Sequence, residues 1–219
     1  MEWNMIKTNS RIESFMIWIL LGAISPIMLF LAGWWGSVGL VAENDIFKFA
    51  FLGLGVGILT DLIFLKKWAA NAFSLNRVVL LFIFLFYSTC IYGFFMGFPV
   101  FNAAMGIVAG LYIGRRMYHQ NADSEEFNRN VKVTGIFATI VMTVICLSSA
   151  LLALSETNLP AQLEGMLRLR FEVTWPMIMG LVVLGGTALI LSQYWLTRKA
   201  ASLAFRASVS TYNLLPKKT

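Results

Sequence analysis

The chain has 219 residues, of which 58% are apolar and 13% are charged, and its mean hydropathy is +0.75. A soluble domain carries charge on about a quarter of its residues, so this composition excludes an ordinary soluble fold. The net charge of +6 does not indicate nucleic-acid binding, because the basic residues stand in short groups at the ends of apolar segments. We therefore predict an all-α integral membrane protein that partners the lipid bilayer and not nucleic acid.

Six apolar segments divide the chain. They are residues 15–36, 46–65, 78–97, 100–114, 133–154 and 173–196. No polar segment is long enough to fold by itself, which predicts a single membrane domain over residues 1–219. The first segment is too long for the apolar part of a signal peptide and precedes no small-residue cleavage site, so we predict an uncleaved span.

The fourth segment is short for a membrane span. Roughly 15 residues of helix cover only about 22 Å, whereas the hydrocarbon layer is about 30 Å thick. Either this span lies in a thinned or protein-surrounded region, or its helix continues past Arg116 through Met117 and Tyr118.

Polar segments follow the fourth, fifth and sixth spans. Residues 119–132 contain a helix start at Ser124, which predicts a short solvated extension leading into the fifth span. Residues 158–171 predict an amphipathic surface helix on the outer side, capped by Asn158 and carrying a Glu164–Arg168 pair. Residues 199–219 form a basic tail, which we expect in the cytoplasm on the anionic membrane surface.

The basic residues set the expected orientation. With six spans and the N-terminus inside, fourteen of the 17 lysines and arginines fall on the inner side. Only Lys48, Arg168 and Arg170 remain outside. Because cytoplasmic loops carry the excess of basic residues, we predict a prokaryotic inner-membrane protein with both termini in the cytoplasm.

Two stretches are similar to each other. Residues 57–71 and 106–120 align without gaps, and in both a glycine-containing span ends on two basic residues. The first two hairpins could therefore be a tandem repeat. Two unrelated spans that end in this way would look equally similar, so both interpretations remain open.

The most distinctive pattern lies in the fourth span. Asn102, Gly106, Gly110 and Gly114 recur every four residues and therefore share one helix face. Such a face usually packs against another helix. A short span with Gly and Pro also indicates a transporter's binding site, and Asn102 stands beside Pro99. We predict substrate contacts at Asn102, Gly106, Gly110 and Tyr112, and helix packing at Gly53, Gly57, Gly93, Gly97 and Gly114.

Asp61 is the only acidic residue well inside an apolar segment. Acids in membrane spans are costly and often mark ion or substrate pathways, which makes Asp61 a further candidate for substrate binding. It also lies only five residues from Lys66, so its carboxylate could instead extend to the inner interface or pair with a lysine.

The residues needed for several kinds of chemistry are missing from the sequence. His119 is the single histidine, which excludes a multi-histidine zinc site and a bis-histidine haem. Cys90 and Cys146 each lie inside an apolar segment, where thiols behave as small hydrophobes. We predict no enzyme, no catalytic residues, no metal and no cofactor.

Two functions remain. The first is a small-molecule transport or binding protein, or a membrane subunit of a transporter, with residues 93–114 lining its site. The alternative is a non-catalytic interaction or assembly subunit, whose glycine faces dock a larger membrane partner or a second copy of the chain.

Overall fold

The computed structural model describes residues 17–18, 20–95, 97–156, 158–168 and 171–213. The regular secondary structure of these residues is helical, and they contain no β-strand. They divide into two compact units, residues 1–76 and residues 77–219, each of which is considered by itself. Nothing in the composition marks this boundary. The start of the first predicted span, the basic residues Lys7, Arg11 and Arg170, and the last six residues of the tail lie outside the described part.

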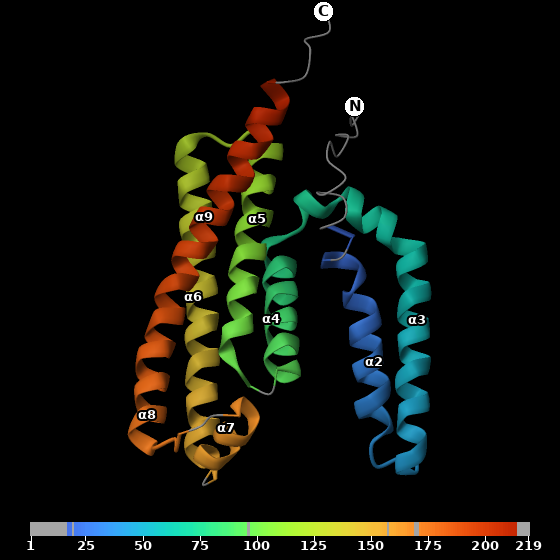
Figure 1. Ribbon diagram of the computed structural model, residues 1–219. Helices are drawn as coiled ribbons and strands as arrows, with labels where there is room; N and C mark the ends of the chain where they lie inside the picture. Colours follow the sequence, from blue (N-terminus) through green and yellow to red (C-terminus); the bar gives the residue numbers. More distant parts are fainter. Residues whose placement is uncertain (1–16, 19, 96, 157, 169–170, 214–219) are drawn as a thin grey trace, which may run out of the picture. The chain divides into compact units, whose positions relative to one another are not determined.

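The first unit is a helical hairpin. Helix α2 (Ile24–Ser37) and helix α3 (Glu43–Ala70) run antiparallel side by side, and a short 3-10 turn, η1 (Ala72–Ser74), follows (Figure 1). The two helices meet at glycines. A Cβ atom added to Gly33 would lie under 3.0 Å from the Phe49 carbonyl, and one added to Gly53 would lie equally close to the Leu29 carbonyl. Such backbone-to-backbone contact is possible only without side chains.

The second unit is a bundle whose consecutive long helices alternate in direction (Figure 1). It contains four longer helices, which are α4 (Arg77–Phe94), α5 (Ala103–His119), α6 (Ser124–Ser155) and α9 (Gly186–Asn213). Shorter elements join them: the 3-10 turn η2 (Pro99–Asn102), α7 (Leu159–Leu167), α8 (Trp175–Gly180) and the π-helical turn η3 (Leu181–Gly185). Helices α8 and α9 are continuous through η3, so the chain crosses this unit for the last time as one long helix.

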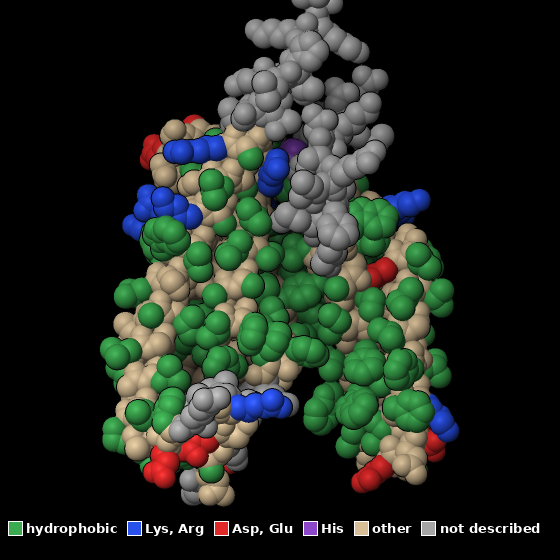
Figure 2. Space-filling view, viewed as in Figure 1, with side chains coloured by type: hydrophobic (Ala, Val, Ile, Leu, Met, Phe, Trp, Pro, Cys, Tyr) green, Lys and Arg blue, Asp and Glu red, His purple; other side chains and the backbone are tan. Residues whose placement is uncertain are grey.

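Five helical stretches in the described residues are long and apolar enough to cross a membrane. These stretches are Leu20–Ser37, Glu43–Ala70, Arg77–Phe94, Ser124–Ser155 and Trp175–Ser208. In both units, large apolar side chains are exposed along the helix sides, and most charged groups in view lie near helix ends (Figure 2). Since such a surface is suited to lipid rather than water, the chain is a polytopic membrane protein.

The interior of the second unit is built where α5 crosses its neighbours. Near the middle of α4, Phe84 packs with Met105 and Ala138. Towards the other end of α5, Ile113 and Met117 join Val131 and Ala201 in a second cluster. Helix α5 is therefore the element around which α4, α6 and α9 are arranged.

Several helix ends differ from the boundaries that we expected. Helix α9 does not stop at residue 196 but continues to Asn213, because Ala200, Ala201 and Ala204 keep it packed on α5. The helix of the fourth apolar segment continues past Arg116 through Met117 and Tyr118, since α5 ends at His119. The basic residues at the start of the predicted tail thus belong to a helix.

The polar connections also took a more specific form than predicted. Asp123 caps α6, where its side chain accepts a hydrogen bond from the Glu126 backbone N–H at 2.7 Å. Helix α7 ends at Leu167, Arg168 has a left-handed backbone beyond it, and the expected Glu164–Arg168 pair is not among the described contacts. Glu164 instead accepts a hydrogen bond from the Val173 backbone N–H at 2.5 Å, which ties the end of this connection to α7.

The two similar stretches use their common face differently. Gly57, Asp61 and Leu65 are buried on α3, and the aligned Gly106, Gly110 and Gly114 are buried on α5. The α3 face packs on α2, the first helix of its own hairpin, whereas the α5 face packs on α9. The shared pattern thus produces two different pairings, and the contacts do not require a common origin.

Candidate functional site

The glycine face of α5 lies directly against α9. A Cβ on Gly110 would lie under 3.0 Å from the carbonyl of Thr197, and one on Gly114 would be equally close to the carbonyl of Ala201. At Gly106 the added Cβ would instead meet a side chain, since it would lie 2.5 Å from the side-chain Nε2 atom of Gln193. Because both sets of positions advance by four residues in the same sense, the two helices run parallel. This face of α5 is therefore filled by a neighbouring helix, and an open groove is absent there.

Gln193 is the polar residue that α9 brings to this contact. Its side chain is 1% exposed, and its Oε1 atom has no hydrogen-bond partner among the described residues. Thr197, one turn further on, is also fully buried but donates its hydroxyl proton to the Gln193 backbone carbonyl at 2.9 Å. Of the two polar residues facing the glycines, Gln193 is the one with a side-chain atom that has no described partner.

Asn102 lies one turn before Gly106, at the end of the η2 turn. Pro99 begins this turn, where its missing N–H and fixed φ are tolerated. The Asn102 side chain is 2% exposed, yet neither its Oδ1 nor its Nδ2 atom has a hydrogen-bond partner in the described structure. An amide buried in this way loses its bonds to water and receives none in return from the described residues, so the burial of Asn102 is costly.

Two further polar groups lie on α4, which runs antiparallel to α5. Ser88 lies one turn after Phe84, which packs against Met105. Because α4 and α5 are antiparallel, this step along α4 leads towards Asn102, which precedes Met105 in the chain. Ser88 is 2% exposed, and its hydroxyl has no partner in the described residues. The hydroxyl of Tyr92, another turn along, is likewise buried and unpartnered there. The unsatisfied polar groups of this unit are thus concentrated towards the α4–η2 end of the bundle.

The turn that closes this end is fastened to α6. Gly97 has φ +81, a backbone conformation that suits glycine and not other residues. The Ser149 hydroxyl donates a hydrogen bond to the Gly97 carbonyl, and the Tyr92 hydroxyl oxygen lies 3.5 Å from where a Gly97 Cβ would be. Gly97 is therefore a turn residue. Gly93 has no described atom within 4 Å of its added Cβ, so helix packing does not involve it in the described part.

Asp61 belongs to the first unit and lies on the face of α3 that meets α2. Its side chain is 7% exposed, and its Oδ1 atom has no hydrogen-bond partner in the described residues. Gly57, one turn earlier, packs against Pro26, where an added Cβ would lie 2.5 Å from the Pro26 Cα. Gly53 and Gly57 both lie close to the α2 backbone, and Asp61 continues the same buried stripe of α3.

Tyr112, the remaining candidate, lies on a different part of α5. It is half-buried, and its hydroxyl interacts with the side chain of Arg116 one turn later. The neighbouring Arg115 donates a hydrogen bond to the Ser208 hydroxyl at 2.7 Å. Tyr112 thus belongs with the basic end of α5, several turns away from Asn102.

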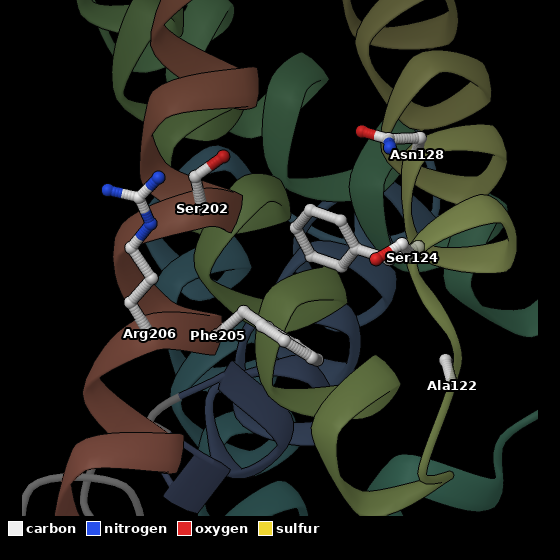
Figure 3. A pocket seen from close by; sticks show the side chains of 7 residues that line it. Ala122, Ser124, Asn128, Ser202, Phe205 and Arg206 are labelled. Carbon is white, nitrogen blue, oxygen red and sulfur yellow. The ribbon is translucent and has the colours of Figure 1, made fainter.

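A hollow of about 310 Å³ lies at the other end of the bundle (Figure 3). It is lined by Ser202, Phe205 and Arg206 of α9 and by Ser124 and Asn128 of α6. Its floor is apolar, because Phe205 packs on Phe127 with ring centroids 4.7 Å apart. Its polar lining side chains are exposed or half-buried, unlike Asn102 and Gln193, so this hollow is an irregularity of the surface and not the buried polar site.

The structure places Gln193 against Gly106, and Gln193 was not among the predicted site residues. A glutamine in the uncharged stretch 187–196 was a signal for Gln193, and a serine directly after Phe86 and Tyr87 was a signal for Ser88. In the described residues, groups of three or more His, Cys, Asp or Glu side chains that could hold a metal ion are absent.

Comparisons with known proteins supply no further assignment, since no family model, curated protein or solved structure matches the chain.

Proposed function

We propose that this chain is a small-molecule binding or transport protein of a prokaryotic inner membrane, with its site among the buried polar side chains of residues 77–219. The observation that carries this proposal is Asn102, an amide 2% exposed whose two polar atoms have no partner in the described structure. Each polar group without a hydrogen-bond partner costs roughly several kcal/mol of free energy in hydrocarbon. A fold therefore retains such a group where a ligand or water supplies the missing hydrogen bond.

The buried polar groups of this unit that have no described partner define the kind of ligand. The amide of Asn102 both donates and accepts, the Gln193 Oε1 atom accepts, and the hydroxyls of Ser88 and Tyr92 do either. The buried polar residues described in this unit carry no charge; they are Ser88, Asn102, Gln193, Thr197 and Ser208. These groups complement an uncharged molecule with several hydroxyl, carbonyl or amide groups.

The proposal includes six spans, since η2 and α5 together can form the fourth. Four residues of 3-10 helix and 17 of α-helix rise about 33 Å, slightly more than the hydrocarbon thickness of about 30 Å. The arginines Arg115 and Arg116 near the end of α5 then reach the inner interface. The positive-inside bias of fourteen basic residues against three supports an orientation with both termini in the cytoplasm.

Ligand binding is tested by thermal unfolding of the purified full chain in detergent, in the presence of sugars, nucleosides and neutral amides. A ligand raises the melting temperature of the wild type, and Asn102→Leu abolishes this rise because the amide contacts are gone. Asn128→Leu, which removes an exposed amide at the other end of the bundle, should leave the rise unchanged. An equal rise in the wild type and in Asn102→Leu would contradict the proposed site.

The alternative function, an interaction subunit, is favoured by open glycines in the last span. Gly180 on α8 and Gly186 on α9 have no described atom within 4 Å of an added Cβ, so another helix could approach them closely. This function predicts purification in a stable complex that Gly186→Leu disrupts, together with no response to any of the solutes.

A further inference from the structure

The α2–α3 hairpin buries a carboxylate whose charge nothing in the described residues balances. Within α3, an ion pair joins Lys48 to Asp45, near the start of the helix, and neither Lys66 nor Lys67 forms an ion pair with Asp61 in the described residues. One oxygen of Asp61 lacks even a hydrogen-bond donor in that part of the chain. An ionised acid at membrane depth is costly, and it is retained where a cation or a pathway requires it.

The helix opposite Asp61 is interrupted. Pro26 has no N–H group, so the carbonyl of Gly22 cannot receive the bond that residue i+4 donates in a regular helix. Accordingly, Ala23 is a turn residue between the helical residues 20–22 and the start of α2 at Ile24. Irregular backbone at membrane depth is tolerated where its freed groups find another partner.

The interruption and the carboxylate lie next to each other. A Cβ added to Gly22 would be 3.0 Å from the Leu65 Cδ2 atom and 3.8 Å from the Asp61 Oδ2 atom, so Leu65 packs on Gly22 and the carboxylate lies beside this contact. Gly57, one turn before Asp61 on α3, packs against Ser25 and Pro26, and its added Cβ would lie 2.7 Å from the Ser25 carbonyl oxygen. Asp61 therefore lies between two points at which α3 touches the backbone of the interrupted helix.

We propose that Asp61 and the freed carbonyl of Gly22 bind one alkali-metal cation. Both groups supply the hard oxygen ligands that Na⁺ and K⁺ prefer, and helix interruptions with free carbonyls bind Na⁺ in membrane transporters. A single carboxylate balances a single positive charge, whereas Ca²⁺ takes six to eight oxygen ligands, commonly from several carboxylates. This site belongs to residues 1–76, so it does not depend on the solute site proposed for residues 77–219.

The test is a cation titration of the purified full chain in detergent, followed by thermal unfolding. NaCl or KCl replaces choline chloride at constant pH and constant total salt, so that ionic strength does not change. The melting temperature of the wild type should rise saturably with Na⁺ or K⁺ and not with choline. Asp61→Asn should abolish this rise or raise the half-saturating concentration at least about tenfold, because the charge that balances the cation is gone.

Two further variants sharpen the test. Asp45→Asn removes an exposed carboxylate of the same helix and should leave the cation response unchanged. Pro26→Ala gives the Gly22 carbonyl its helical donor and should weaken the response several-fold while the helical circular dichroism is retained. An absent response in the wild type, or an unchanged one in Asp61→Asn, would overturn the cation site. If Asp61→Asn does not fold, an unchanged half-saturating concentration in Pro26→Ala overturns it.

The solute site and the cation site can fail separately. The cation response should persist in Asn102→Leu, and any solute response should be measured at a saturating cation concentration. Loss of the solute response alone leaves the cation site standing, and loss of the cation response in Asp61→Asn leaves the solute site standing.

Discussion

The parallel contact between α5 and α9 can be tested with a single methyl group at Gly110. A Cβ at this position would lie under 3.0 Å from the backbone carbonyl of Thr197 and 3.1 Å from the backbone nitrogen of Ala201. Backbone atoms in the middle of a helix cannot turn aside as a side chain can. The two helices must therefore separate by a few tenths of an ångström or more, which also loosens the contact at Gly114.

The magnitude follows from two opposing effects. Forcing one extra carbon into a close-packed interior costs about 1–3 kcal/mol, and the backbone neighbour places Gly110→Ala in the upper part of that range. Replacing glycine by alanine inside a helix returns at most about 1 kcal/mol. We expect Gly110→Ala to lower the free energy of unfolding by about 1–2 kcal/mol.

Two other glycines provide matched comparisons. The nearest atom to a Cβ at Gly106 is the far end of the Gln193 side chain, which can move, so Gly106→Ala should cost less than Gly110→Ala. Gly186 lies in open space on α9, so Gly186→Ala should be neutral or slightly stabilising. The Cβ at Gly106 would also lie 2.8 Å from the Thr197 hydroxyl oxygen, so Gln193→Ala should relieve only part of the cost of Gly106→Ala in a double-mutant cycle.

The assay is reversible unfolding by SDS in mixed micelles, followed by circular dichroism. The expected order of destabilisation is Gly110→Ala, then Gly106→Ala, then Gly186→Ala. If Gly110→Ala proves no less stable than Gly186→Ala, the close backbone contact between α5 and α9 does not exist in the membrane-embedded protein.

Three further predictions concern the ends of the helices. Ser149→Ala removes the hydrogen bond to the Gly97 carbonyl and should lower the unfolding free energy by about 1 kcal/mol, with Ser148→Ala as the control because Ser148 bonds only within its own helix. Asp123→Ala removes the α6 cap and should cost about 1 kcal/mol in the same assay, whereas Asp123→Asn should retain most of that stability. In a variant without Cys90 and Cys146, a cysteine at Glu156 should react with an impermeant maleimide added outside the cell, and one at Asn128 only after permeabilisation; the reverse pattern would refute the proposed orientation.

The sequence by itself determined the features that depend on local composition. Apolar length indicates which segments cross the membrane, and the cap at the start of α6 arises from a few neighbouring polar residues. The hydroxyls of Thr139, Thr143 and Ser148 bond to their own preceding turn, as expected for such residues in a span. These interactions are settled within one helix and therefore need no knowledge of its neighbours.

Only the tertiary structure decided which faces meet. The glycines of α5 could have packed on α4, their neighbour in sequence, but they pack on α9, roughly ninety residues later. That choice buries Gln193 and makes α9 longer than the predicted sixth span. In lipid every apolar face is equally well solvated, so hydropathy cannot select a partner, and close approach of small residues from distant segments selects it instead.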